Sequence, residues 1–88
     1  MSWKVELTPE ANAALKRLGK PEAQRIVRFL FERVQNRENP REIGDALKGN
    51  LREYWRYRVG HYRILCRLED EVVTVFVIHI AHRREVYK

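Results

Sequence analysis

Five residues in the C-terminal half of the chain have the types and spacing to bind an anion. They are Arg56, Arg58, Arg63, Arg83 and Tyr87. Guanidinium groups fork onto phosphate oxygens, and a phenol can stack on a nucleobase. Folding alone does not require four arginines and a tyrosine in one region. We therefore expect them to form an anion site.

The Gly60-His61 pair predicts a two-residue hairpin turn, because the residues on both sides alternate in polarity. In that register Arg58 faces Arg63 directly, with Arg56 on the same face. Opposed like charges destabilise a sheet, whereas an anion held between two guanidiniums makes the arrangement favourable. The alternative is that Arg58 and Arg63 splay into water or pair with an acid such as Glu53. A slip of one residue would move Arg63 to the other face.

A second turn at Asp70-Glu71 predicts that residues 72–81 run back along the preceding strand. The segment with Arg83 and Tyr87 would then reach the Gly60 end of the sheet, as catalytic loops on rigid scaffolds do. Tyr87 could stack on a base or cover apolar surface, and composition does not separate the two.

Lys48, His61 and His82 are weaker candidates. Lys48 lies in a turn-rich segment, where it is either a phosphate contact or a solvated loop lysine. Histidine is well matched to proton transfer near neutral pH, so His61 and His82 are candidate proton carriers and His82 a candidate RNA contact. The alternative for both histidines is a structural or exposed role.

The chemistry that fits these residues is cleavage of an RNA phosphodiester, in which the 2′-hydroxyl is an internal nucleophile. The chain has no Ser/His/Asp order, metal-ligand spacing or glycine-rich phosphate loop, so we expect neither metal nor cofactor. The protein need only position the backbone, stabilise charge on the phosphorane and assist proton transfer. Arginine stays protonated up to a pKa of about 12 and is a poor base, which leaves the proton acceptor open.

The rest of the chain predicts the elements that position this site. Residues 3–7 alternate as a short strand, 9–18 and 20–34 have helical apolar spacing, and 36–50 are rich in turn residues. With three strands after them, these elements predict an α+β two-layer sandwich of order β-α-α-β-β-β. Its helical hairpin would pack on a mostly antiparallel four-stranded sheet. Residues 72–81 are apolar on both parities, which predicts a central strand covered on both faces.

Composition limits the class of protein. The 88 residues predict one domain, 1–88, and 18 Lys and Arg against 12 Asp and Glu give a net charge of +6. That balance favours a polyanionic partner, although a solvated basic surface would look the same. The single cysteine, Cys66, lies in an apolar strand and is expected to pack there. We expect a cytoplasmic protein without a membrane partner, because no signal core or spanning run is visible.

Three segments of the sequence resemble the RelE/ParE superfamily of bacterial and archaeal toxins, most closely its RelE-like branch. They are LKGN at 47–50, WRYRVGHYRILC at 55–66 and FVIHIAHRREVY at 76–87. The resemblance implies a type II toxin–antitoxin system with a RelB-like antitoxin. It also implies a metal-independent endoribonuclease that cuts mRNA in the ribosomal A site by 2′-hydroxyl attack. The alternative is the ParE branch, which inhibits DNA gyrase without cleaving RNA.

The resemblance assigns roles residue by residue. Arg63 matches a phosphate-binding arginine, Arg83 an arginine of transition-state stabilisation or leaving-group protonation, and Tyr87 a tyrosine that stacks on the substrate. Arg56 and Arg58 stand where the RelE branch has lysines. A lysine with a lowered pKa can act as a base and an arginine hardly can, so this departure concerns the proton acceptor rather than the binding site.

Overall fold

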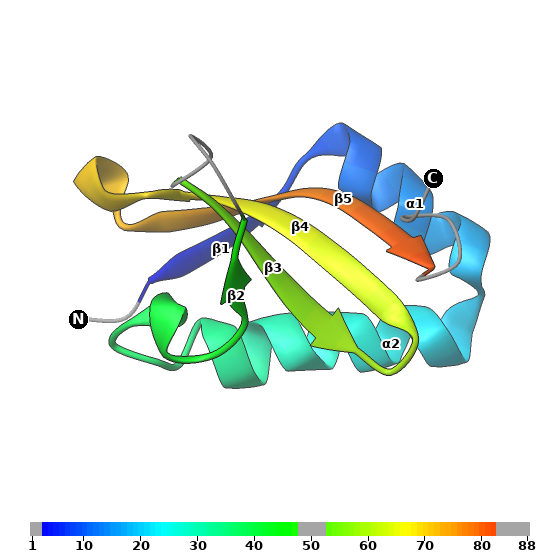
Figure 1. Ribbon diagram of the computed structural model, residues 1–88. Coiled ribbons are helices and arrows are strands. Elements are labelled where there is room, and N and C mark those ends of the chain that lie inside the picture. Colours follow the sequence, from blue (N-terminus) through cyan, green and yellow to red (C-terminus); the bar gives the residue numbers. More distant parts are fainter. Residues whose placement is uncertain (1–2, 48–52, 83–88) are drawn as a thin grey trace.

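The computed structural model describes residues 3–47 and 53–82 and has the expected order of elements with one short strand added (Figure 1). In chain order they are β1 (Lys4–Leu7), α1 (Pro9–Leu18), α2 (Lys20–Arg28), β2 (Asp45–Ala46), β3 (Tyr54–Val59), β4 (Tyr62–Glu69) and β5 (Thr74–His82). A stretch of π-helix, Phe29–Val34, follows α2 directly. The sheet order is β1-β5-β4-β3-β2, in which only β1 and β5 pair in parallel. The predicted α+β class is confirmed.

The two helices begin and end where the local chemistry requires. Thr8 caps α1, because its Oγ1 accepts a hydrogen bond from the Ala11 amide at 3.2 Å. The same hydroxyl donates to the Val77 carbonyl at 2.8 Å and so ties the helix start to β5. Gly19 separates the helices with φ +90°, a backbone conformation that favours glycine.

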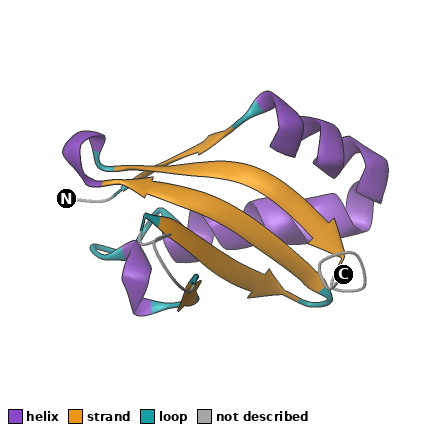
Figure 2. Cartoon of the chain, turned by 45° about the horizontal axis from the view of Figure 1, so that its top comes forward, coloured by secondary structure: helices purple, strands orange, loops and turns teal. Residues whose placement is uncertain are grey.

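The second helix supplies the apolar layer against the sheet. Ile26, Leu30 and Val34 are fully buried and recur at helical spacing, as the sequence predicts. Opposite them lie the core residues of the strands, among them Tyr57, Ile64 and Val77. Figure 2 shows the long helix behind the sheet, with no helix over the near face in the described part of the chain.

The sheet has one strand more than the sequence predicts. Asp45 pairs with Arg56 and Ala46 with Trp55, which makes β2 a fifth strand at the edge beside β3. Two residues cannot display a period-2 pattern, and β2 lies inside the turn-rich segment. The prediction of four strands is therefore wrong, although the long strands are as expected.

The apolar run at residues 72–81 predicts a strand covered on both faces, but the structure gives a different reason for it. Val75 and Val77 are buried, and the register then shifts at Ile78, so that Ile80 rather than His79 pairs with Ile64 in the core. A bulge of this kind turns the following residues to the opposite parity. Phe76, on the other face, is only half-buried. The strand is apolar on both parities partly because the bulge changes which parity faces the core.

Candidate functional site

The hairpin joining β3 and β4 has the predicted register. Arg58 pairs with Arg63 and Val59 with Tyr62 across a two-residue turn. Gly60 in this turn has φ +59°, which residues with a side chain rarely adopt. Arg56 lies two residues before Arg58 on the same face of β3. We call Arg56, Arg58 and Arg63 the hairpin site.

An acid that sequence reasoning missed lies beside this site. Asp45 Oδ2 is 3.9 Å from Arg56 Nη2 and 3.8 Å from Arg58 Nε. Glu53, the acid considered from the sequence, is not the partner of either arginine in these contacts. Both Asp45 distances are long for an ion pair, and the Asp45 side chain is 53% exposed, so the pairing is weak. One carboxylate therefore lies near two guanidiniums, those of Arg56 and Arg58.

The loop that presents Asp45 is fixed to β3 by two hydrogen bonds, one part-buried and one buried. The Trp55 indole Nε1 donates to the Ile43 carbonyl at 2.7 Å. The Tyr57 hydroxyl donates to the Pro40 carbonyl, also at 2.7 Å. Burial raises the pKa of the Tyr57 phenol, so this group remains a neutral donor and not a base.

Between these anchors, Gly44 lies directly against β3. It has φ +86°, and a Cβ built there would be 2.6 Å from Trp55 Nε1 and 2.7 Å from the Arg56 carbonyl oxygen. Any other residue would push the loop away from the strand. Gly44 is therefore a positioning residue for Asp45, and the sequence marks it only as one of several turn glycines.

A hollow of about 110 Å³ lies at the turn, and the groups best suited to binding a phosphate line it. Its lining residues are Arg58, Gly60, His61, Tyr62 and Arg63. Two guanidiniums and an imidazole thus surround a space open to solvent and large enough for a small anion. This arrangement suits charge stabilisation at a phosphate with proton transfer close by.

The end of β5 comes alongside this turn, as predicted. Ala81 pairs with Arg63 and His82 with Tyr62, so His82 is directed to the face of the sheet opposite the hairpin site. There its ring stands edge-on to Tyr62 at 5.3 Å between centroids and lies 5.9 Å from His61. His82 thus lies at the predicted end of the sheet, on the face opposite the hairpin site. Lys48, Arg83 and Tyr87 lie outside the described residues.

Two acids at the opposite end of β4, Glu69 and Asp70, have basic partners. Asp70 accepts two hydrogen bonds from the Arg41 guanidinium, each 3.0 Å long. These bonds hold the pKa of the Asp70 carboxyl below its ordinary value. Glu69 pairs with Arg67 at 2.7 Å. Both acids are far from the hairpin site along β4 and do not take part in it.

Three further features of the described residues concern metal binding, the single cysteine and membrane spans. Residues 3–47 and 53–82 hold no group of three or more His, Cys, Asp or Glu arranged for a metal ion. Cys66 is fully buried, and burial raises the pKa of its thiol, so its role is packing. No helix in the described part is long and apolar enough to cross a membrane.

The structure has a helical hairpin on one face of a mostly antiparallel sheet and arginines at one hairpin end, and comparison with known proteins identifies its family. The chain belongs to the family described as ParE toxin of type II toxin–antitoxin system, whose model matches residues 5–87. The superfamily resemblance is thereby confirmed.

Relatives of known sequence come from the RelE side of the superfamily. Toxin RelG of Mycobacterium tuberculosis is 32% identical over 88 residues, covering 100% of this chain and 99% of RelG. Toxin RelE of the same organism is 33% identical over 86 residues, covering 98% of this chain and 87% of RelE.

Solved structures agree in fold. The toxin–antitoxin complex RelBE2 of Mycobacterium tuberculosis contains a chain with TM-score 0.83 and 29% identity, matched over 94% of this chain and 100% of that one. A variant of the E. coli toxin RelE in the free state has TM-score 0.79 at 24% identity, over 98% and 88% of the two chains. The second of these likenesses concerns the fold alone.

Proposed function

We propose that this toxin is a ribosome-dependent mRNA endoribonuclease that inhibits translation by cleaving mRNA in the A site. The observation that carries the proposal is the direct pairing of Arg58 with Arg63, beside Arg56 and the small hollow at the turn. Two guanidiniums directly opposite each other in a sheet become favourable when an anion binds between them. A phosphodiester is such an anion, and the curated relatives are RelE-type toxins.

The reaction needs little from the protein. The RNA 2′-hydroxyl attacks the adjacent phosphorus, the bond to the 5′-oxygen of the next nucleotide breaks, and a 2′,3′-cyclic phosphate remains. Arg58 and Arg63 would bind the phosphate oxygens and stabilise the phosphorane, and Arg56 would hold the neighbouring backbone. Neither metal nor cofactor is required. In this proposal Arg83 and Tyr87 act as the resemblance implies, in leaving-group protonation and stacking.

The protein partners follow from the same proposal. Several solved relatives are toxins in RelB–RelE complexes, from Mycobacterium tuberculosis, Pyrococcus horikoshii and Methanococcus jannaschii. We expect a RelB-like antitoxin to bind and neutralise this chain, and the ribosome with its mRNA to be the target. A ribosomal target implies a cytoplasmic protein, and His82 and Lys48 are proposed as further RNA contacts.

Primer extension on mRNA from induced cells, and on purified mRNA with and without ribosomes, tests the proposal. We expect cuts only with ribosomes, and at least about a hundredfold less cleavage in Arg58→Ala/Arg63→Ala, since one such donor is worth that much in other enzymes. Arg17→Ala is the matched control, an exposed arginine on α1. Intact transcripts in growth-arrested cells would count decisively against cleavage.

The same induction separates the alternative function. The matching family carries the ParE name, and the resemblance attaches gyrase inhibition to that branch. A gyrase inhibitor would alter plasmid supercoiling and stay toxic after Arg58→Ala/Arg63→Ala. Toxicity that disappears with the two arginines, without a change in supercoiling, supports the endoribonuclease.

A further inference from the structure

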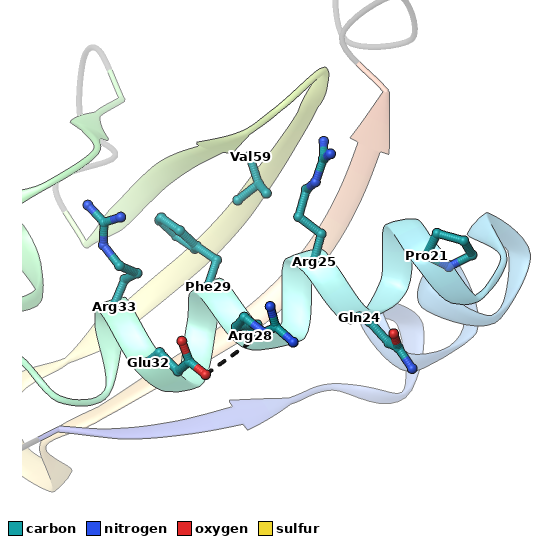
Figure 3. Close-up of a pocket in the computed structure, with 8 residues that line it drawn as sticks. All are labelled: Pro21, Gln24, Arg25, Arg28, Phe29, Glu32, Arg33 and Val59. Atoms are coloured by element: carbon teal, nitrogen blue, oxygen red, sulfur yellow. Dashed lines mark ion pairs between the residues drawn. The ribbon is translucent and has the colours of Figure 1, made fainter.

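A groove on the helix side of the sheet is lined by arginines that the hairpin site does not use. It has a volume of about 400 Å³ and lies between α2 and the end of β3. Its lining includes three arginines, one acid and two apolar residues: Arg25, Arg28, Phe29, Glu32, Arg33 and Val59. Figure 3 shows the side chains of Arg25, Phe29 and Arg33 directed from the helix toward β3, where Val59 closes the floor. We call this space the helix groove.

The helix groove leads to the hairpin site. A second hollow of about 300 Å³ shares Phe29 and Arg33 with it and extends to Tyr57, Asp45 and Arg58. Arg58 also lines the small hollow at the turn. Among the described residues, no strand pairs with the last residues of β3 on the side of β2, and Arg58 there lines both hollows.

Arg25 makes a second connection, at the turn itself. A Cβ built on Gly60 would lie 2.9 Å from Arg25 Nη1, so the guanidinium reaches the hairpin turn through space that glycine leaves free. Arg25, Phe29 and Arg33 follow each other at intervals of four residues and share one helix face. At 1.5 Å per residue they span about 12 Å along the helix axis. A line of positive charge thus runs from the turn along the helix.

Acids neutralise this line only in part. Arg25 and Arg28 each lie 3.9 Å from a glutamate of the same helix, Glu22 and Glu32. All four side chains are at least 42% exposed, so these pairs are weak and exchange readily with another anion. Arg33 has no ion pair with any residue that the structure describes. Phe29 stands edge-on against Tyr57 at 5.8 Å, giving the floor a fixed apolar face.

We propose that the helix groove binds the sugar–phosphate backbone of a single RNA strand, a stretch flanking the phosphate held at the hairpin site. The inference rests on the proposed function for the identity of the strand. Arg25, Arg28 and Arg33 contact phosphates, and Phe29 with Val59 offers an apolar surface for a base. Continuity through Arg58 favours RNA over an acidic protein segment, because one polyanion can then occupy both spaces.

Fluorescence anisotropy with a 2′-O-methyl RNA oligonucleotide, which cannot be cleaved by 2′-hydroxyl attack, tests the groove across a range of salt concentrations. Arg25→Ala/Arg33→Ala is expected to weaken binding about tenfold and to reduce the slope of log K against log salt by about 1.4, since each single-strand phosphate contact contributes about 0.7. Lys16→Ala/Arg17→Ala removes the same charge from exposed positions on α1 and should change affinity less than about twofold, as a long-range charge effect alone would. Circular dichroism checks the fold of both variants.

Equal losses in the two double variants, or none in the groove variant, would overturn the proposal. So would a groove variant that keeps its RNA affinity but loses binding to polyglutamate, since the groove would then take an acidic protein segment. The binding result is independent of catalysis. If the wild type never cuts mRNA but the groove variant loses RNA affinity, only the proposed function fails; if cutting is normal and RNA affinity is equal, only the groove proposal fails.

Discussion

The balance of charge around Asp45 determines how strongly the hairpin site attracts an anion. Its carboxylate lies 3.8 to 3.9 Å from two arginines, and a phosphate that binds these arginines must displace it. Asp45→Asn keeps the side-chain shape and removes the competing charge. We expect RNA affinity to rise about two- to fivefold at low salt, which corresponds to one weak ion pair. Anisotropy with the 2′-O-methyl oligonucleotide measures it.

Asp70→Asn provides the control for this effect. It also removes one negative charge, but from the turn at the other end of β4, where Arg41 is its partner. Equal gains in both variants would mean that net charge rather than the position of Asp45 sets the affinity, and the local argument would then be wrong.

At the scale of elements, the fit of the 40–46 loop against β3 rests on Gly44. Gly44→Ala adds a methyl group within 2.8 Å of three atoms of β3, at a φ of +86°. We expect it to lower the free energy of unfolding by about 2 to 5 kcal/mol, from backbone strain together with overpacking. Urea unfolding measures the change. Release of the loop should also remove the hydrogen bond from Trp55 to Ile43 and alter tryptophan fluorescence.

Gly19→Ala isolates the steric part of that cost. Gly19 has almost the same φ, +90°, but nothing lies within 4 Å of a Cβ built there. Gly19→Ala should lower the free energy of unfolding only by the cost of backbone strain, about 1 to 3 kcal/mol. If Gly19→Ala destabilises as much as Gly44→Ala, the close approach of the loop to β3 carries no extra energy.

The elements also show what sequence could predict. Alternation on both sides of Gly60-His61 was enough for the register that opposes Arg58 and Arg63, because one face of the hairpin is buried and a slip would expose the core. Asp45 could not be predicted, since its strand is two residues long and is held by long-range pairing. The face of His82 depended on the bulge at Ile78, which a run of apolar residues does not reveal.

Only part of the helix groove could likewise be predicted from the sequence. The apolar stripe of residues 20–34 predicted which residues enter the core; Ile26 and Leu30 are buried as expected, whereas Phe31, also in the stripe, is exposed. The polar positions of a helix have no such constraint in sequence. That Arg25 and Arg33 flank Phe29 toward β3 follows from how the helix lies on the sheet, and only the assembled fold gives that.

In the whole molecule, charge is divided between the two ends of the central hairpin, and one cluster joins distant parts of the chain. Arg41 forks onto Asp70, 29 residues away, and its guanidinium lies 5.9 Å from the centre of a Trp3 ring. This cluster connects the N-terminal strand, the 40–42 turn and the turn between β4 and β5. It lies at the end away from the hairpin site, so it should affect stability without affecting RNA binding.

This cluster makes stability depend on pH in a definite direction. The hydrogen bonds from Arg41 lower the pKa of Asp70 in the folded protein, so its stabilisation is present above the unfolded carboxyl pKa, about 3.9, and disappears as pH falls through the lower folded value. Because the Asp70 side chain is 65% exposed, solvent limits the pair to about 0.5 to 1 kcal/mol. Asp70→Asn should cost that much at pH 7, and its unfolding curve should converge on that of the wild type in strong acid. Urea titrations between neutral pH and about pH 2 follow the difference through that window.

Glu71→Gln is the control for the Asp70→Asn measurement. Glu71 is exposed in the same turn, and the structure gives it no ion pair with a described residue. Its variant should match the wild type at every pH. If Glu71→Gln reproduces the loss, the turn responds to negative charge in general rather than to the fork on Asp70. If Asp70→Asn keeps a constant deficit into strong acid, the side chain contributes through packing, and the ion pair between Arg41 and Asp70 does not hold the three segments together.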